Sequence, residues 1–282
     1  MNQGRIQAIL PTSAFVLLWS SGAIFSEFGL RNGSPFALLL LRYGIAMILL
    51  LAAAAYHRQL IPAAGTRGRV MLIGALIAGG YTICYLLAMT HGVAPGILAT
   101  IMGVQPILTI MLTEKRASFW RITGLLCSFA GLFLIVNDGL SHSRFELLGL
   151  FFACMALLGI TLGSIIQKRE TQAPWVVLPL QYSVALAMIL AITPFVPLET
   201  NWSMTFIISG LWLGLIISVV ATFLLYHLIS KGNLVNVTSL FYLVPGVTAA
   251  LDWMILGNPM SLHAIGGLAL VMAGLILVFR KS

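Results

Sequence analysis

Long apolar stretches separated by short polar breaks run through the whole chain. A helix needs about 20 mostly apolar residues to cross the hydrocarbon core of a bilayer, and ten stretches approach or reach that length. They cover residues 12–30, 36–56, 70–89, 94–113, 119–136, 147–166, 175–195, 206–229, 234–256 and 262–279. The breaks carry turn residues, such as Asn32-Gly33 and Asn258-Pro259, because Gly and Asn tolerate positive φ and Pro begins helices. The pattern predicts an all-α membrane protein with ten transmembrane helices.

The composition excludes two other classes of protein. Hydrophobic residues make up 60% of the 282 residues and charged residues 8%, whereas soluble domains are about 25% charged. So few charges cannot cover a water-facing surface, which excludes a soluble globular enzyme and also a disordered protein. The three cysteines, Cys84, Cys127 and Cys154, lie in apolar stretches without a C-x-x-C motif. We therefore expect no disulfide, no metal site and no cofactor.

The basic residues predict which way the chain crosses the membrane. Cytoplasmic loops retain Lys and Arg, because these residues resist translocation. With the N-terminus in the cytoplasm, twelve of the fifteen Lys and Arg lie on that side, Arg31 and Arg144 lie outside, and Arg42 falls within a span. This split predicts that both termini are cytoplasmic. It also accounts for the net charge of +8 with no nucleic-acid partner.

An internal repeat divides the chain into residues 1–140 and 141–282. Pro35 precedes Tyr43 by eight residues in the first copy, and Pro174 precedes Tyr182 by eight in the second. Each copy then carries a mid-span proline and two glycines seven residues apart: Pro106, Gly124 and Gly131, then Pro245, Gly267 and Gly274. Five helices per copy is an odd number, so the second copy enters the membrane from the opposite side. The sequence predicts a 5+5 inverted-topology repeat, a pattern typical of secondary transporters.

Further motifs accompany the repeat. They are Trp19-Ser20-Ser21-Gly22, Arg42-Tyr43 after Pro35, and Glu114 ten residues before Gly124. Over nearly the whole chain these residues resemble two copies of the EamA-type repeat, which defines the drug/metabolite transporter superfamily. The second copy departs from the pattern, with Asn258 near the place of the acid and Gln181 in place of the arginine.

Within that superfamily the chain is most similar to the bacterial aromatic amino-acid exporters. This resemblance implies a multi-pass protein of a bacterial-type inner (cytoplasmic) membrane. It also implies export of small metabolites, amino acids and aromatic ones first, with no cofactor.

Polar and aromatic side chains at mid-membrane depth are the candidate substrate-binding groups. A hydroxyl or amide at that depth faces the bundle or a wet cavity rather than lipid, because lipid offers no hydrogen-bond partner. We expect six such residues to line a central cavity: Trp19, Ser20, Tyr81, Tyr85, Gln105 and Tyr242. The alternative is that they only tie helices together. In an alternating-access carrier, Pro106 and Pro245 are candidate hinges, because proline removes a backbone hydrogen bond.

Ionisable side chains within the spans are candidates for charge or proton roles. Glu27 and Arg42 lie at similar depth on neighbouring helices. Either they form a structural ion pair, or Arg42 reaches up to the lipid headgroups, or the two contact the substrate. Asp252 is four residues from the end of the ninth span, and we expect it at the membrane interface. His91 and His227 lie near opposite surfaces and are either proton carriers or interfacial anchors.

Alternative functions share parts of this pattern. A multidrug or other metabolite exporter would have the same fold, while an intramembrane enzyme or a channel would belong to another class. The sequence contains no H-E-x-x-H, no G-x-S-x-G and no paired carboxylates, so it offers an enzyme no recognisable catalytic residues. The fifth and tenth helices carry few polar groups and the glycine pairs. We expect them to be packing helices or the contact of a homodimer.

Overall fold

The computed structural model describes residues 3–113, 119–141, 146–225 and 243–279. Helices dominate this part of the chain, in which the β-structure is an isolated bridge between Gly33 and Thr200. Seven helices are long and apolar enough to cross a membrane. The fifth, ninth and tenth predicted spans contain shorter apolar helices, Ile122–Ile135, Val244–Leu256 and Leu262–Gly274. The all-helical membrane architecture is therefore confirmed, while the count of ten crossings stays a prediction.

The helices follow the predicted spans in order. In residues 1–140 they are α1 (Gln3–Leu30), α2 (Pro35–Tyr56), the run α3 (Arg67–Ile73), η1 (Gly74–Tyr81) and α4 (Thr82–Thr90), the pair α5 (Pro95–Met102) and α6 (Gln105–Thr113), and α7 (Phe119–Ser141). The later helices are α8 (Leu147–Gln167), α9 (Pro174–Ile192) with η2 (Thr193–Phe195), α10 (Met204–Leu211) with η3 (Trp212–Ala221), α13 (Leu243–Leu251) with η5 (Asp252–Leu256), and α14 (Leu262–Phe279). Residues 226–242, which include parts of two predicted spans, lie outside the described residues.

Turn chemistry sets where several helices begin. The Ser34 hydroxyl accepts a hydrogen bond from the Ala37 backbone N–H at 3.2 Å, and Pro35 occupies the first turn of α2. Pro95 and Pro174 likewise open α5 and α9. A serine cap supplies an acceptor for an otherwise unpaired N–H, and proline lacks the N–H that would be unpaired there. These starts are the ones that the polar breaks predict.

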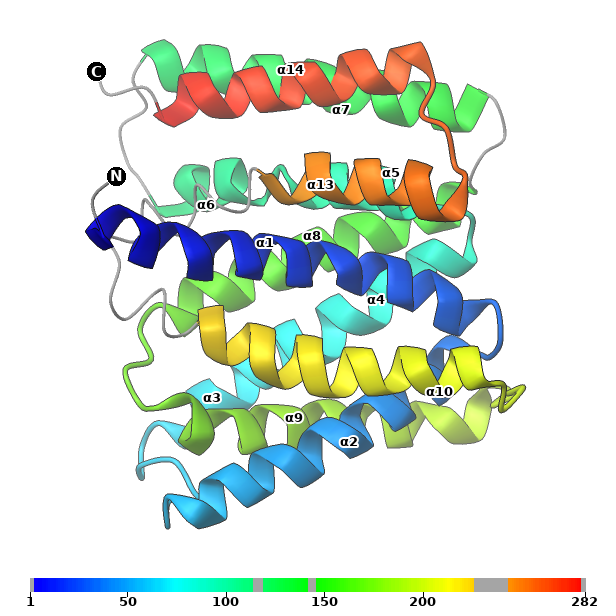
Figure 1. The fold of residues 1–282 in the computed structure, drawn as a ribbon. Coiled ribbons are helices and arrows are strands. Elements are labelled where there is room, and N and C mark those ends of the chain that lie inside the picture. Colours follow the sequence, from blue (N-terminus) through cyan, green and yellow to red (C-terminus); the bar gives the residue numbers. More distant parts are fainter. Residues whose placement is uncertain (1–2, 114–118, 142–145, 226–242, 280–282) are drawn as a thin grey trace.

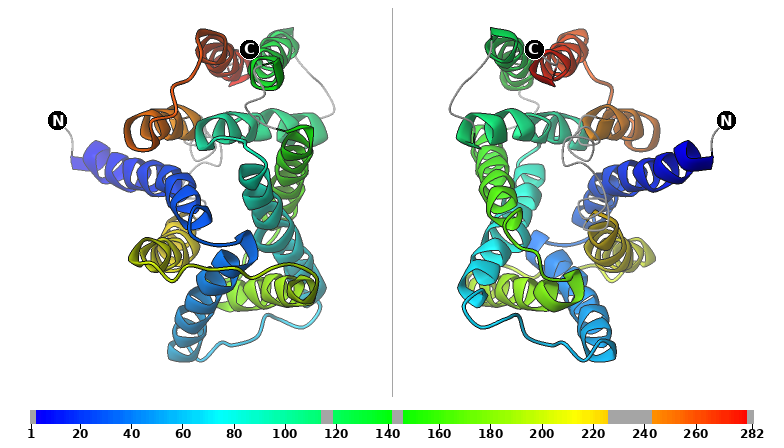
Figure 2. Two further views of the ribbon diagram at one scale, coloured as in Figure 1. Left: turned by 90° about the vertical axis from the view of Figure 1, so that its right-hand side faces the viewer. Right: turned by 90° about the vertical axis from the view of Figure 1, so that its left-hand side faces the viewer.

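The helices surround a common centre. In the end views of Figure 2, α2 and α9 lie on one side and α5 and α13 on the opposite side, with α1 and α10 facing α4 and α8 across the bundle. The first turn of α1 and the last turn of α14 lie at the same end (Figure 1). That is the predicted inner end, and the turn between α1 and α2 lies at the predicted outer end.

The pair α7 and α14 stands apart from this ring (Figures 1 and 2), and the two helices contact each other far more than any other helix. Glycine permits the approach, because a Cβ atom on Gly267 would lie 2.6 Å from the Gly131 carbonyl oxygen. The expected packing role of the glycine pairs is thus met within one chain. A homodimer contact stays a prediction.

Three spans contain π-helical segments, within the described residues, that hydropathy does not predict. They are Gly74–Tyr81 in the third span, Trp212–Ala221 in the eighth and Asp252–Leu256 in the ninth, and the first two occupy equivalent places in the two repeats. In a π-helix the backbone bonds run from i to i+5, and in both equivalent segments a threonine hydroxyl adds a further hydrogen bond to a carbonyl. The Thr82 hydroxyl donates to the Ile77 carbonyl at 3.2 Å, and the Thr222 hydroxyl to the Ile217 carbonyl at 3.1 Å. The same device in both copies shows how closely the two repeats correspond.

Candidate functional site

A tyrosine pair joins the two repeats at the α2–α9 contact. The Tyr43 and Tyr182 rings meet edge to face with centroids 5.0 Å apart. The Tyr43 hydroxyl donates to the Ala78 carbonyl in η1, and the Tyr182 hydroxyl donates to the Ser218 carbonyl in η3 at 3.1 Å. Each tyrosine therefore binds a carbonyl of the π-helical segment in its own repeat, while its ring packs on the other repeat.

Glycines bring each π-helical segment against the opposite repeat. A Cβ atom on Gly74 would lie 2.6 Å from the Gln181 carbonyl oxygen, and one on Gly214 would lie 2.7 Å from the Arg42 carbonyl oxygen. No side chain fits at either position, because backbone cannot move aside as a flexible side chain can. The close packing fixes Arg42 and Gln181, which occupy equivalent places, at the interface of the repeats.

Arg42 is the charged residue at this interface. Its Nε atom donates to the Ser218 hydroxyl at 2.9 Å, and its guanidinium carbon lies 5.5 Å from the centre of the Tyr43 ring. Helix α2, which carries Arg42, also contacts α4 of the third span. Within the described ranges, Arg42 has no ion pair. Of the alternatives for these residues, the Glu27–Arg42 ion pair is not formed, because Glu27 pairs with Arg31 one turn later, at 3.0 Å.

Tyr81 and Tyr85 lie one helical turn apart on the third span. Their rings meet at 65° with centroids 5.6 Å apart, and both side chains are partly exposed. Neither hydroxyl has a hydrogen-bond partner among the residues that the structure describes. These two hydroxyls, from the end of η1 and from α4, are therefore available to donate to a solute.

The predicted site residues of α1, Trp19 and Ser20, both pack against α13. Ser20 is fully buried, and its hydroxyl donates to the Val244 carbonyl at 3.4 Å, so it ties α1 to α13. The ring centroids of Trp19 and Phe15 lie 5.3 Å apart, and Trp19 belongs to an apolar cluster with Val244 and Val247. The structure therefore places Ser20 and Trp19 at the α1–α13 contact.

A second aromatic pair, absent from the sequence prediction, lies nearby. Phe25 stacks on Trp212 with centroids 4.7 Å apart, and the Trp212 indole N–H donates to the Ser21 hydroxyl at 2.9 Å. All three side chains are partly exposed. Hydropathy did not single out Trp212, although tryptophan beside Gly210-x-x-x-Gly214 signals close helix contact.

The fourth span breaks immediately before its proline. Helix α5 ends at Met102 and α6 begins at Gln105, whose side-chain amide donates to the Ser164 hydroxyl at 3.2 Å. At the break, a Cβ atom on Gly103 would lie 2.8 Å from Cγ of Pro245 in α13. The interruption before Pro106 therefore packs against the mid-span proline of the other repeat.

Asp252 is a buried acidic residue. Its side chain is 2% exposed and accepts hydrogen bonds at 2.8 Å from the Gly96 backbone N–H and the Asn258 side chain. Gly96 lies in the first turn of α5, where the free N–H groups and helix dipole favour a carboxylate. Asp252 is thus buried against α5 and joins the two repeats, while its partners lie at helix ends, Gly96 in the first turn of α5 and Asn258 just after η5. Its place at the membrane interface stays a prediction.

The histidine and remaining tyrosine predictions have different outcomes. His91 follows α4, and its Nδ1 atom lies 2.6 Å from a Glu146 carboxylate oxygen. Glu146 is mostly exposed before α8, so this contact lies at the predicted outer surface. His227 and Tyr242 lie outside the described residues, and Pro106 is placed by its backbone alone.

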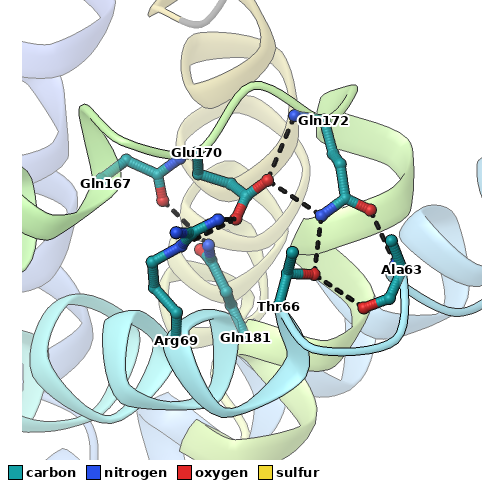
Figure 3. A network of polar contacts seen from close by, with 7 residues as sticks. All are labelled: Ala63, Thr66, Arg69, Gln167, Glu170, Gln172 and Gln181. Carbon is teal, nitrogen blue, oxygen red and sulfur yellow. Dashed lines mark hydrogen bonds and ion pairs between the residues drawn. The ribbon is translucent and has the colours of Figure 1, made fainter.

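A network of hydrogen bonds and one ion pair joins the two repeats at the predicted inner end (Figure 3). Arg69 pairs with Glu170 at 3.1 Å, and the Gln172 side chain bonds Glu170, Thr66 and the Ala63 backbone N–H at 2.8–2.9 Å. Burial opposes ionisation of Glu170, but hydrogen bonds from Gln172 and Arg69 prevail and lower the pKa of its carboxyl. We call this set of residues the inner clasp.

A matching outer clasp joins the turns at the other end. The Asn201 backbone N–H donates to the Asn32 carbonyl at 2.7 Å, and the Ser34 backbone N–H donates to the Glu199 carbonyl at 2.8 Å. The Ser203 hydroxyl adds a hydrogen bond to the Asn32 side chain at 2.8 Å. The turn after α1 is thereby tied to the segment before α10.

Comparisons with known proteins agree with this architecture. The chain is 26% identical over 290 residues to an uncharacterized transporter of Archaeoglobus fulgidus, covering 95% of each chain. It is 22% identical to the uncharacterized transporter YdfC of Bacillus subtilis, over 96% of this chain and 90% of that one. A solved crystal structure shares the fold, with a TM-score of 0.65 and 19% identity over 99% of this chain and 100% of the other. The EamA-like transporter family matches residues 7–137 and again 144–280, so the chain belongs to the EamA-like transporter family and is a multi-pass membrane transporter.

Proposed function

We propose that the protein exports small organic metabolites, neutral and aromatic amino acids first, by alternating access. The observation that carries this proposal is the paired arrangement of the two repeats about Tyr43 and Tyr182. In inverted repeats, the two copies can exchange conformations, which opens a central site first to one side and then to the other.

The contacts suggest which part of the bundle moves. The α2–α9 side carries the tyrosine pair in the middle and a clasp at each end. The opposite side, α5 and α13 (Figure 2), carries the helix break at Gly103 and the adjacent Pro245. A broken helix bends at lower cost than a continuous one. We therefore assign the rigid support to α2 and α9 and the bending to α5, α6 and α13.

The aromatic side chains that we assign to the site suit organic substrates. Aromatic groups from α1, α4 and η3 supply stacking surface, as in Phe25, Tyr85 and Trp212. Aromatic rings bind other apolar or aromatic groups over a large area with little geometric demand. Such contacts discriminate poorly between similar side chains, so a broad specificity among amino acids is expected.

The test is uptake into proteoliposomes that contain the purified protein. We expect saturable counterflow of labelled phenylalanine driven by unlabelled phenylalanine, and competition by other neutral amino acids. Flux that does not saturate would indicate a channel. Saturable transport of organic cations alone would support the multidrug alternative, and chemical conversion of the solute would indicate an enzyme.

A further inference from the structure

Arg42 has a guanidinium group that the structure holds in place but does not neutralise. It lies seven residues after the start of α2, about 10 Å into the membrane at 1.5 Å per residue. Its Nε atom donates a hydrogen bond to the hydroxyl of the fully buried Ser218 at 2.9 Å. This bond fixes the plane of the guanidinium group. The two terminal nitrogens bind no group in the described part of the chain. A cation at this depth requires an anionic or strongly polar partner.

The nearby carboxylates are engaged elsewhere. Glu27 pairs with Arg31, Glu146 with His91 and Glu170 with Arg69. Asp252 accepts from Gly96 and Asn258 instead. Of the acids whose side chains the structure describes, none neutralises Arg42, so an anionic solute can serve as its partner.

The surroundings of Arg42 complete an anion site. Tyr81 and Tyr85 lie on the third span, whose helix α4 contacts α2. Both side chains are partly exposed, and neither hydroxyl has a hydrogen-bond partner among the described residues. A guanidinium offers two parallel N–H groups that match the two oxygens of a carboxylate, and charge-assisted bonds of this kind are strong. The two phenol donors would satisfy the remaining lone pairs.

The second repeat lacks this chemistry. At the equivalent positions it has Gln181, Ala221 and Leu225 in place of Arg42, Tyr81 and Tyr85. The Gln181 side chain is 3% exposed and donates to Gln167 at 2.9 Å. Structural groups are expected to recur in both copies, as the tyrosine pair and the threonines of the π-helical segments do. A polar cluster in one copy alone points to ligand binding.

We propose that Arg42, Tyr81 and Tyr85 bind the carboxylate of the transported solute, so that the substrates are carboxylate-bearing metabolites rather than organic cations. This inference rests on the proposed carrier function and narrows its substrate class. Ser218 acts as a positioning residue, since it holds Nε and leaves the other two nitrogens free.

Competition with matched analogues tests the inference in proteoliposomes. Phenylalanine and 3-phenylpropionate carry the carboxylate, whereas phenylalaninamide and phenethylamine do not. We expect the two carboxylates to inhibit counterflow at concentrations at least about 10-fold lower than the other two, the minimum for one charge-assisted contact. Arg42→Gln should abolish this preference, and Arg42→Lys should retain part of it. Arg31→Gln, which changes an ion-paired arginine at the same end of the bundle, should leave it intact.

The outcomes separate the inference from the function on which it rests. Saturable transport with equal inhibition by phenylalanine and phenylalaninamide would overturn the carboxylate site and leave the carrier standing. Transport of quaternary ammonium probes, but of no carboxylate, would do the same. Absence of saturable transport for every probe would remove the proposed function itself. Normal elution and thermal unfolding of Arg42→Gln show that the variant is folded, so a lost preference is then due to the site.

Discussion

Tyr43 and Tyr182 meet edge to face at the α2–α9 contact, with their ring planes 71° apart, and each hydroxyl binds a carbonyl of a π-helical segment. The hydroxyl of Tyr43 donates 35 residues along the chain and that of Tyr182 36 residues along. The same side-chain hydrogen bond, which a tyrosine hydroxyl adds to a carbonyl of a π-helical segment, therefore occurs in both repeats.

Removing either hydroxyl should destabilise the bundle. Tyr43→Phe and Tyr182→Phe each leave a buried carbonyl without its donor, at a cost of about 1–3 kcal/mol. Thermal unfolding in detergent measures the loss. Tyr56→Phe is the matched control, because Tyr56 is 85% exposed. Equal midpoints for all three variants and the parent would show that the two buried hydrogen bonds do not matter.

Two adjacent glycines of α14 test the contact between α7 and α14. Gly267→Ala places a Cβ atom 2.6 Å from the Gly131 carbonyl oxygen, whereas nothing lies within 4 Å of a Cβ on the adjacent Gly266. Overpacking of this kind costs about 1–3 kcal/mol, so Gly267→Ala should unfold at lower temperature. Gly266→Ala should unfold at the parent temperature or slightly above it. A similar loss in both variants would contradict the observed contact face.

The inner clasp should respond to pH through Glu170. Its pKa is lower in the folded protein than its ordinary value of 4.5, so the stabilisation is present above that value and is lost as pH falls through the folded-state value. The difference in unfolding midpoint between the parent and Glu170→Gln should therefore be largest at neutral pH and shrink below about pH 4. Glu199→Gln, an exposed carboxylate at the other end, is the control. A constant difference across this range would exclude the ion pair as its cause.

The orientation of the chain needs its own measurement. Single cysteines at Leu198 and at Ala64 lie in exposed turns at opposite ends of the bundle, in a background lacking Cys84, Cys127 and Cys154. An impermeant thiol reagent should label the cysteine at 198 in intact cells and the cysteine at 64 only after permeabilisation. The reverse pattern would place both termini outside.

The sequence predicts the helices well because their signals are local. Apolar length marks the spans, and Pro35, Pro95 and Pro174 mark where helices begin. The glycine pairs mark the fifth and tenth spans as packing helices, but their spacing leaves open whether the contact lies within one chain or between two. The π-helical segments escape prediction, because a shift from i+4 to i+5 bonding adds one residue without changing the apolar pattern.

The site is less predictable because depth along a helix does not give direction around it. Glu27 and Arg42 share a depth, yet Glu27 bonds Arg31, an i,i+4 pair that helix geometry alone would have suggested. Asp252 is buried because Gly96 offers a free backbone N–H in the other repeat. The link from Arg42 to Ser218 spans 176 residues, and no local rule anticipates it.

The hinge prediction concerns the two mid-span prolines, and the chain supplies its own control. An alanine at position 106 would regain a backbone N–H that can reach the carbonyl of Met102, four residues earlier, and so join α5 and α6 into one helix. Pro245→Ala would remove the ring on which Gly103 packs. We expect both variants to fold normally and to transport more slowly, because a straightened or unsupported helix favours one face of the carrier.

Pro179→Ala, which restores a bond inside α9 on the proposed rigid side, should leave the turnover rate unchanged. Initial rates in proteoliposomes, normalised to folded protein, measure the effect. Slowing by Pro179→Ala as large as that by Pro106→Ala would instead mean that stiffening any central helix impairs transport, and the α5–α6 break would lose its special role.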